Sequence, residues 1–405
     1  MKKLTFNSLI WGVFIFYLFT IIAFGDRVEY YRYSNITFLV LIGLMSIYVA
    51  RRRLLVPTKI FMFLPFLLFS FLSVTWSYMP DSTMQRSITL LRLSILLFVM
   101  AFYLIRSKQT EQFIYGIAVA GLIILLYILS FYGLSGLRQM IEEGMRVGGE
   151  FVNSNTLAIY LSFSAVIYFY LFLNKRKWYF VLLVVGLVVV IASTGSKKGL
   201  LDLAVGFVMV TGFNQDSSNG VKKLFKWVAG ISIAAVLLYF LWESPLFFTV
   251  RERYEVMFMF LSGNGSRIDY STRERQIMLE AGWQQFLKTP ILGIGIGASG
   301  YLTTFSLGSD TYLHNEYIEL LATGGIIGFI LQFAPVFTLL VKNWKYRKVS
   351  REAQLCTILL VIYLINGIAA VQYFSKLSYV IFAISLACYL INDHKSIEML
   401  NNKTL

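Results

Sequence analysis

Long apolar runs recur along the chain, separated by basic or glycine-rich breaks. A helix needs about 20 predominantly apolar residues to cross a bilayer, and the alternating pattern of a membrane β-barrel is absent from the sequence. The pattern predicts an all-α polytopic membrane protein with about twelve transmembrane helices. We expect these helices near residues 7–24, 36–50, 60–78, 87–105, 113–132, 155–173, 179–194, 199–213, 227–242, 315–341, 353–371 and 377–391.

Composition supports this class, because 58% of the 405 residues are hydrophobic and only 14% are charged. A soluble domain of this length is less apolar. The first run, residues 7–24, lacks a small-x-small cleavage site and is long and aromatic-rich, so we expect a retained helix rather than a signal peptide. Cys356 and Cys388 fall inside apolar runs, which predicts buried side chains and neither a disulfide framework nor a zinc site.

The net charge of +15 would suit nucleic acid, but membrane topology explains most of it. With both termini in the cytoplasm, more than half of the 36 basic residues fall in cytoplasmic segments, as the positive-inside rule requires. The expected partner is therefore a lipid bilayer and not nucleic acid. The remaining cations lie where that rule does not place them.

The apolar runs and the one long hydrophilic insertion divide the chain into four parts. Residues 1–146 form N-terminal transmembrane helices, and residues 147–242 form central ones. Residues 243–314 form a long extracytoplasmic loop that contains short helices. Residues 315–405 form the C-terminal transmembrane helices and a short cytoplasmic tail.

Several of the remaining cations suit an anionic ligand. Arg92 lies inside the fourth predicted helix, where a charge usually faces a wet cavity or reaches the interface. Lys197 and Lys198 lie in a polar turn expected outside the membrane, which suits a phosphate or diphosphate group, or simply lysines at an interface. One of Asn153 and Asn155 is expected to cap the sixth helix.

The segment around residues 273–314 holds the most chemistry. Arg273 and Arg275 lie near the start of a predicted helix over 273–288, where the helix dipole prefers acids, so a bound anion or a solvated helix end would explain them. His314, followed by Asn315, can take and give a proton near neutrality, although a lone interfacial histidine can also be merely amphipathic. No further ligand sits at metal spacing, so neither a metal nor another cofactor is expected.

The glycine-spaced stretch from Gly293 to Gly300 contains a literal G-x-G-x-x-G pattern starting at Gly295. That fingerprint needs a preceding strand and a βαβ unit, which a helical membrane protein does not supply. We therefore interpret these glycines as positions where the backbone packs closely or approaches a substrate.

Four pieces in order resemble the bacterial O-antigen ligase and polymerase family, over about residues 147–341. The pairing of Pro290-Ile-Leu-Gly-Ile-Gly with the later His314-Asn315 is the specific part. Lys197 falls where the family commonly has arginine, and Thr323 replaces a frequent acidic residue. The four pieces are Gly-Gly-x-Phe-x-Asn-x-Asn at 148–155, Thr-Gly-Ser-Lys at 194–197, Arg275 through Gly297, and His314-Asn315 with Gly-Gly-Ile-Ile-Gly at 324–328.

The resemblance implies a GT-C-like, metal-independent and inverting glycosyltransferase of the cytoplasmic (inner) membrane, with its active site facing outside. It implies a polyprenyl-diphosphate-linked glycan donor, such as one carried by undecaprenyl diphosphate, and a glycan acceptor. His314 would be the general base and Arg275 would hold the donor diphosphate. Further diphosphate contacts would come from Arg273, Lys197, Lys198 and Arg92, and substrate contacts from Asn153, Asn155 and Asn315.

Family members divide by acceptor. The chain is rich in Lys, Ile, Phe, Tyr and Asn, which is typical of proteins from AT-rich genomes and favours a Gram-positive host without lipid A. We therefore expect a polymerase for capsule, exopolysaccharide or O-antigen. A flippase and a chain-length regulator are compatible partners. A ligase that transfers the glycan to lipid A core or to protein is the alternative. A transporter of lipid-linked glycans would also suit twelve helices and an intramembrane arginine, but the sequence shows no inverted repeat.

Overall fold

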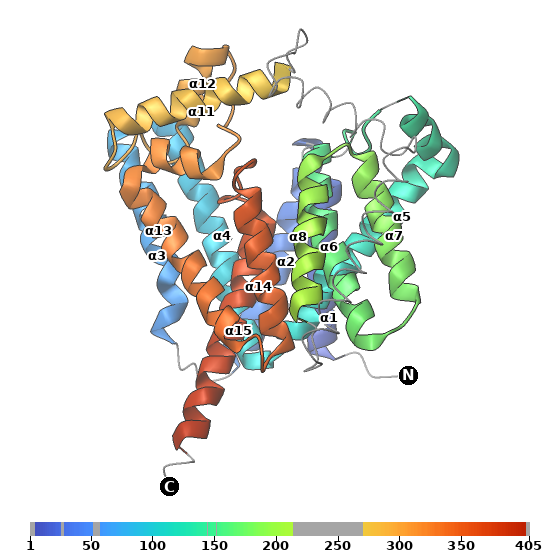
Figure 1. Ribbon diagram of the computed structural model, residues 1–405. Coiled ribbons are helices and arrows are strands. Elements are labelled where there is room, and N and C mark those ends of the chain that lie inside the picture. The colour runs from blue at the N-terminus through green and yellow to red at the C-terminus, as the bar shows by residue number, and fades with distance from the viewer. Residues whose placement is uncertain are drawn as a thin grey trace, which may run out of the picture. The chain divides into compact units, whose positions relative to one another are not determined.

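The computed structural model describes residues 5–25, 28–51, 57–143, 145–150, 152–213 and 270–401, and these ranges contain helices and no strands (Figure 1). The chain forms two compact units. The first unit comprises Met1–Ile10, Val40–Phe113 and Ile268–Leu405, and the second unit comprises Trp11–Leu39 and Ile114–Arg267.

Eight helices within the described ranges are long and apolar enough to cross a membrane, and each coincides with a predicted span. The polytopic all-α class is therefore confirmed. The predicted span 227–242, and residues 243–269 of the predicted loop, lie outside the described residues. The eight helices are Phe6–Ala23, Tyr31–Ala50, Thr58–Trp76, Pro80–Ser107, Thr110–Met140, Ser154–Lys175, Glu316–Tyr346 and Lys376–His394.

The other three predicted spans correspond to shorter helices, so the total of twelve stays a prediction. These are α7 (Tyr179–Ser193), α8 (Lys197–Phe213) and α14 (Arg351–Asn366), with 15, 17 and 16 residues. At about 1.5 Å per residue such helices are shorter than the roughly 30 Å hydrocarbon core.

In the first unit, α4 packs along α15, and α13 packs against α3, α14 and α15. Helix α11 lies across one end of these helices, where it contacts α12 and α13 (Figure 1). We call this end of the first unit the His314 end. The bounds are α3 Leu64–Leu72, α4 Pro80–Ser107, α11 Tyr270–Lys288, α12 Ser299–Leu307, α13 Glu316–Tyr346 and α15 Lys376–Asn401, with short 3-10 helices at Thr58–Phe63 and Ser73–Trp76.

Two helices of the first unit differ from the prediction in ways that shape the site. Helix α4 begins at Pro80, about two turns before the predicted start at 87, because proline fits the first helical position and the polar residues that follow continue the helix. Helix α13 is interrupted at Gly325, whose φ of 59° and ψ of −167° lie outside the helical region. The break frees backbone groups in the middle of the helix for other partners.

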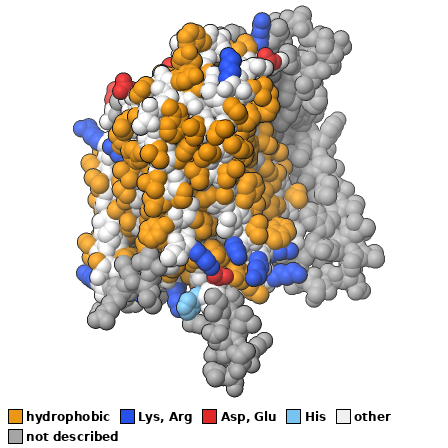
Figure 2. Space-filling model, turned by 90° about the vertical axis from the view of Figure 1, so that its left-hand side faces the viewer, with side chains coloured by type: hydrophobic (Ala, Val, Ile, Leu, Met, Phe, Trp, Pro, Cys, Tyr) orange, Lys and Arg blue, Asp and Glu red, His pale blue; other side chains and the backbone are white. Residues whose placement is uncertain are grey.

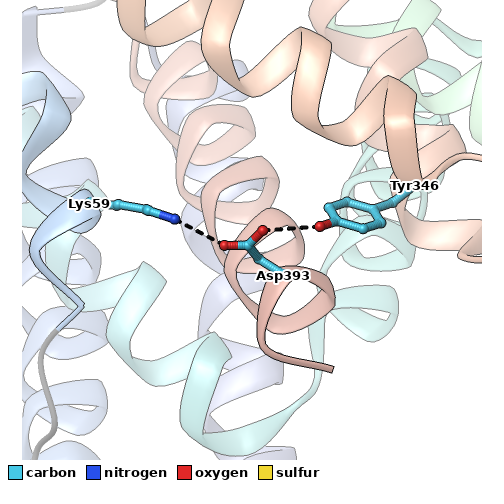
Figure 3. Close-up of polar contacts among 3 residues, drawn as sticks. All are labelled: Lys59, Tyr346 and Asp393. Atoms are coloured by element: carbon cyan, nitrogen blue, oxygen red, sulfur yellow. Dashed lines mark hydrogen bonds and ion pairs between the residues drawn. The ribbon is translucent and has the colours of Figure 1, made fainter. Parts of the chain in front are cut away.

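Three side chains join helices at the opposite end of the first unit (Figure 3). Lys59 Nζ lies 3.0 Å from one carboxylate oxygen of Asp393, and the Tyr346 hydroxyl donates to the other at 3.0 Å. The Lys59 side chain is 54% exposed, so this ion pair contributes at most about 1 kcal/mol to stability. Its role is to fasten the ends of α13 and α15 to the segment that precedes α3.

One face of the molecule shows a broad apolar band between edges where charged side chains gather (Figure 2). A membrane protein presents such a surface to lipid because the hydrocarbon core excludes charge while the interfaces accept it. Both cysteines are buried, as the sequence predicts.

The second unit is built around α6 (Ser154–Lys175), which packs against α7 and α8. Helix α8 begins close to α6, because a Cβ at Gly199 would lie 2.7 Å from the Ala158 Cβ. The pair is also joined by a buried hydrogen bond from the Ser162 hydroxyl to Asp202 at 3.0 Å. The long helix α5 (Thr110–Glu142), kinked at Gly133, belongs mostly to this unit, and α1 (Phe6–Ala23) and α2 (Tyr31–Ala50) each contribute to both units.

Candidate active site

His314 lies in a constrained turn immediately before α13. Its φ of 57° places it in the left-handed region, which is costly for a residue other than glycine, by about 1–2 kcal/mol. The other described non-glycine residues with this conformation, Lys108 and Arg176, terminate helices, where it is common. A histidine held in this conformation ahead of a helix indicates a functional constraint.

Asn315 supplies part of that constraint. Its side-chain oxygen accepts a hydrogen bond from the Ile318 N–H at 3.0 Å, which caps α13. Its side-chain nitrogen donates to the Ile368 carbonyl at 2.9 Å, which joins the turn to the loop after α14. The predicted substrate-binding residue Asn315 therefore holds the turn, while a substrate contact stays a prediction.

Two buried carboxylates in the first turn of α13, just after His314, bind neighbouring segments. Glu319 accepts hydrogen bonds from the Leu313 N–H at 2.9 Å and from the Ser299 hydroxyl at 2.7 Å. Glu316 accepts from the Gln372 N–H at 2.7 Å and also from the hydroxyl of Tyr363. Both glutamates are fully buried, so each satisfied bond matters for the geometry of the loop.

Helix α11 brings Arg275 toward this turn. Met278 and Gly282 follow Arg275 on one helix face, at spacings of three and four residues. Met278 packs in a cluster with Leu313, and a Cβ at Gly282 would lie 2.6 Å from a Leu313 methyl group. Arg275 is half-buried on that face, whereas Arg273 is exposed and lies about 200° around the helix. The geometry therefore favours Arg275 over Arg273 as a partner of His314.

The glycine-rich segment packs against the break in α13, which confirms close backbone packing and excludes a dinucleotide fold for this segment. The Gly295 N–H donates to the Thr323 carbonyl at 2.8 Å, and the Ile326 N–H donates to the Pro290 carbonyl at 2.8 Å. Gly293, Gly295 and Gly297 have φ values of 65°, 105° and 86°, which side-chain-bearing residues rarely adopt.

Gly297 lies directly against Arg86 of α4, because a Cβ there would be 2.7 Å from the Arg86 Cβ. Arg86 is half-buried, and its guanidinium carbon lies 3.4 Å from the centre of the Phe374 ring. It also interacts electrostatically with Glu319. Arg86 is thus a cation of the His314 end that sequence reasoning did not select.

Arg92, which the sequence did select, lies elsewhere on α4. It is exposed within the first unit and interacts electrostatically with Lys376 at the start of α15. Six residues correspond to about 600° of helix rotation, so Arg86 and Arg92 point to different sides of α4. The structure does not bring Arg92 to the His314 turn, and its diphosphate role stays a prediction.

A cavity of about 610 Å³ opens at the His314 end, beside α11 and α12. Leu302 in its wall packs in the same cluster as Leu313. Its wall offers flat apolar faces from Tyr78, Tyr301 and Phe305, and hydrogen-bonding groups from Gln284, Gln285 and Lys288. Aromatic faces combined with hydrogen-bonding groups suit sugar rings.

Four other predicted residues gather in the second unit. Asn153 caps α6 by accepting from the Asn155 N–H at 2.9 Å, so Asn153 is the expected cap. The Asn155 side chain accepts from Arg146 at 3.0 Å, and Arg146 also donates to the Thr194 carbonyl at 2.7 Å. Arg146, which sequence reasoning did not select, thereby joins the loop before α6 to the turn that leads into α8. Lys197 and Lys198 follow in the first turn of α8, half-buried.

Within the ranges that the structure describes, no group of three or more His, Cys, Asp or Glu side chains could hold a metal ion. The titratable groups of the His314 turn are instead one histidine and two carboxylates that already accept hydrogen bonds.

Residues 182–333 match a protein-family model described as O-antigen ligase. Over this segment, the chain is similar to the O-antigen ligase family. The match supports the resemblance that the motifs indicated, although it covers less of the chain, and it supports an enzyme similar to the glycosyltransferase-like ligases and polymerases of that family. No curated protein matched the chain in a separate comparison. The matched segment includes Lys197, Lys198, Arg273, Arg275, His314 and Asn315, whereas Arg86, Arg92, Asn153 and Asn155 lie before it.

Proposed function

We propose that this protein is a polysaccharide polymerase that joins polyprenyl-diphosphate-linked repeat units, with His314 as the general base. The observation that carries the proposal is the left-handed turn at His314, which Asn315 and Glu319 hold within a segment of the O-antigen ligase family. A strained histidine fixed by buried hydrogen bonds is what a positioned proton acceptor requires.

In the proposed reaction, the imidazole of His314 removes the proton from an acceptor hydroxyl. The hydroxyl oxygen then attacks the anomeric carbon of the donor sugar from the face opposite the diphosphate. As the new carbon–oxygen bond forms, the bond to the diphosphate breaks and the diphosphate leaves with the electron pair. The anomeric configuration inverts, and the scheme needs no metal ion or other cofactor because cationic side chains stabilise the leaving group.

Arg275 is the proposed ligand of that diphosphate, because it is half-buried on the α11 face that packs against Leu313. A guanidinium offers two parallel N–H donors to a phosphate and remains charged at any physiological pH. Lys197 and Lys198 are proposed as further phosphate-binding residues, since they lie in the first turn of α8, where backbone N–H groups add to their charge.

The proposed orientation places the His314 end outside the cytoplasm. Lys342, Lys345, Arg347 and Lys348 gather at the other end of α13, and Arg351 begins α14. Basic residues next to transmembrane helices stay on the cytoplasmic side. A lipid-linked donor would then meet the enzyme at the outer face of the cytoplasmic membrane.

A ligase is the second candidate, favoured by the description of the matching family. Both enzymes use the same donor and the same base, and they differ in the acceptor. Composition favours a polymerase, because a host without lipid A has no lipid A core to receive the glycan.

The test incubates the purified protein in detergent with its lipid-diphosphate-linked repeat unit alone and resolves the products by size. We expect a ladder of multiples. A single transfer that appears only after another glycan or protein acceptor is added would establish a ligase instead. If no acceptor gives a product while the protein moves lipid-linked units across vesicle membranes, the protein is a transporter and the proposal is wrong.

The matched variants are His314→Asn and His394→Asn. Asparagine tolerates the left-handed conformation, so the first variant removes the base without adding strain. We expect transfer to fall at least about 100-fold, the usual contribution of a general base, with an unchanged melting temperature. His394, the other histidine of the chain, is exposed in α15, and its variant should keep full activity. Wild-type activity in His314→Asn would refute the base assignment.

A further inference from the structure

The guanidinium of Arg86 has the features of an anion ligand. Its guanidinium carbon lies over the Phe374 ring, 3.4 Å from the ring centre, and 5.9 Å from the centre of the Tyr373 ring. Stacking on an aromatic ring holds a guanidinium in place while its N–H donors at the edge stay available.

No residue in the described part of the chain accepts a hydrogen bond from those donors or forms an ion pair with them. Glu319 interacts with Arg86 electrostatically, but both of its oxygens already accept bonds from Ser299 and Leu313. None of the guanidinium nitrogens is a fully buried atom, so an anion at the surface can accept hydrogen bonds from them.

The surrounding backbone is shaped around the Arg86 side chain. Gly297 has a φ of 86°, and a Cβ at this position would lie 2.7 Å from the Arg86 Cβ and 3.1 Å from its Nε. Glycine at this position therefore permits the positive φ and also leaves room for the Arg86 side chain. The same segment continues into α12, where Ser299 binds Glu319.

A short chain of contacts connects Arg86 to the proposed base. Arg86 interacts electrostatically with Glu319, and Glu319 binds the backbone N–H of Leu313, the residue before His314. The cation and the base thus belong to one packed region of the first unit. The leaving diphosphate of the proposed reaction needs positive charge in this region.

We propose that Arg86 binds the diphosphate of the polyprenyl-linked donor, as a second cation in addition to Arg275. This inference rests on the proposed function. The ligand chemistry is a phosphate or diphosphate group that accepts two N–H bonds from one guanidinium. A polyprenyl diphosphate, inorganic diphosphate and an anionic phospholipid headgroup all share that chemistry, so the experiment compares them.

The experiment measures binding of sugar-free polyprenyl diphosphate to the purified full-length protein in detergent. The variants are Arg86→Gln and Arg86→Lys, and the control is Arg106→Gln, which removes an arginine from the last turn of the same helix. We expect Arg86→Gln to weaken binding about 10- to 100-fold, as loss of a charge-assisted pair of bonds predicts. Arg86→Lys should recover part of the loss, because it keeps the charge without the planar fork. The control should bind like the wild type.

Further arms separate the alternatives. Polyprenol, which lacks the diphosphate, should bind equally to wild type and Arg86→Gln, and inorganic diphosphate should compete only weakly. Wild-type affinity of Arg86→Gln for polyprenyl diphosphate would overturn the inference. It would also be overturned if polyprenol binding and the melting temperature fell in parallel, which would mean a structural role, or if an anionic phospholipid competed as well as polyprenyl diphosphate.

The readout also distinguishes this inference from the proposed function. Binding that depends on Arg86, in a protein that transfers glycan to no acceptor, would support the diphosphate site and refute the enzyme. A ladder of products from a protein whose diphosphate binding does not depend on Arg86 would support the enzyme and refute the diphosphate site at Arg86.

Discussion

Glu319 is predicted to be a positioning residue for His314, and its removal tests the geometry of the turn. Its two oxygens accept from the Leu313 N–H at 2.9 Å and the Ser299 hydroxyl at 2.7 Å, and the side chain is fully buried. In Glu319→Ala both donors lose their acceptor inside the protein. Each buried unsatisfied donor costs about 1–3 kcal/mol, so the two together cost about 2–6 kcal/mol.

Glu319→Gln should have an intermediate effect. The amide oxygen can still accept from the Leu313 N–H, and the NH₂ group can donate to the Ser299 hydroxyl oxygen, but both bonds lose the carboxylate charge at a cost of about 1–2 kcal/mol. Local opening of the loop can relieve that cost, which lowers the population of the held His314 conformation about 5- to 30-fold. We therefore expect kcat to fall by this factor while KM changes little, because Glu319 itself touches no substrate in the proposed reaction.

The assay is initial-rate glycan transfer over a range of donor concentrations, with the melting temperature of each variant measured in the same detergent. Glu280→Gln is the matched control, since Glu280 is exposed on α11 and bonds only to Gln276 at 2.9 Å among the contacts found. It should change stability by less than about 0.5 kcal/mol and leave the rate unaffected. The reasoning is refuted if Glu319→Gln keeps kcat within twofold of wild type, or if its rate merely follows the folded fraction.

The remaining predictions address the glycine segment, the helix cap and the orientation. Gly297→Ala should reduce transfer and lower the melting temperature, because its φ of 86° disfavours a side chain and the new Cβ would lie 2.7 Å from the Arg86 Cβ; Gly149→Ala, where no atom lies within 4 Å, should change neither. Asn315→Ala should destabilise the protein to thermal or denaturant unfolding by about 1 kcal/mol through loss of the α13 cap, and Asn315→Asp, which keeps the capping acceptor, should lose less. If both variants unfold like the wild type, the cap does not hold the turn. A cysteine introduced at the exposed Ser309 should react with a membrane-impermeant maleimide on intact cells, over little background because both native cysteines are buried; labelling only after permeabilisation would invert the proposed orientation.

Much of the helical framework was predictable because its signals are local. The predicted helix over 273–288 corresponds to α11, which ends at Lys288 just before Pro290. The start of α4 was missed because hydropathy detects only its apolar part. The available signal was Pro80 followed by polar residues, a pattern typical of a helix start.

Candidate site residues could be predicted from the sequence where the residue type itself indicates the chemistry. His314 and Arg275 stand out as a rare histidine and an arginine on an amphipathic helix, and in the structure Met278 of that helix packs with Leu313, the residue before His314. The sequence indicates Arg92 rather than Arg86 as an anion-binding residue, because a charge inside an apolar run is typical of a functional site, whereas Arg86 lies in the polar first turns of α4. Only packing shows that Arg86 meets Gly297 and Phe374.

The sequence by itself determined the membrane-spanning class, most helix positions, an asparagine cap before the sixth predicted helix and the resemblance to the O-antigen ligase family, because these depend on contiguous hydrophobicity and short motifs. Tertiary structure decided that Arg86 lies at the His314 end, what the buried glutamates bind, and how the glycine segment pairs with the break in α13. Those contacts join residues such as Gly295 and Thr323, or Glu319 and Ser299, whose proximity depends on how α11, α12 and α13 pack. The physical reason is that helix formation is governed by near neighbours, whereas hydrogen bonds between separate elements form only when packing brings their partners within about 3 Å.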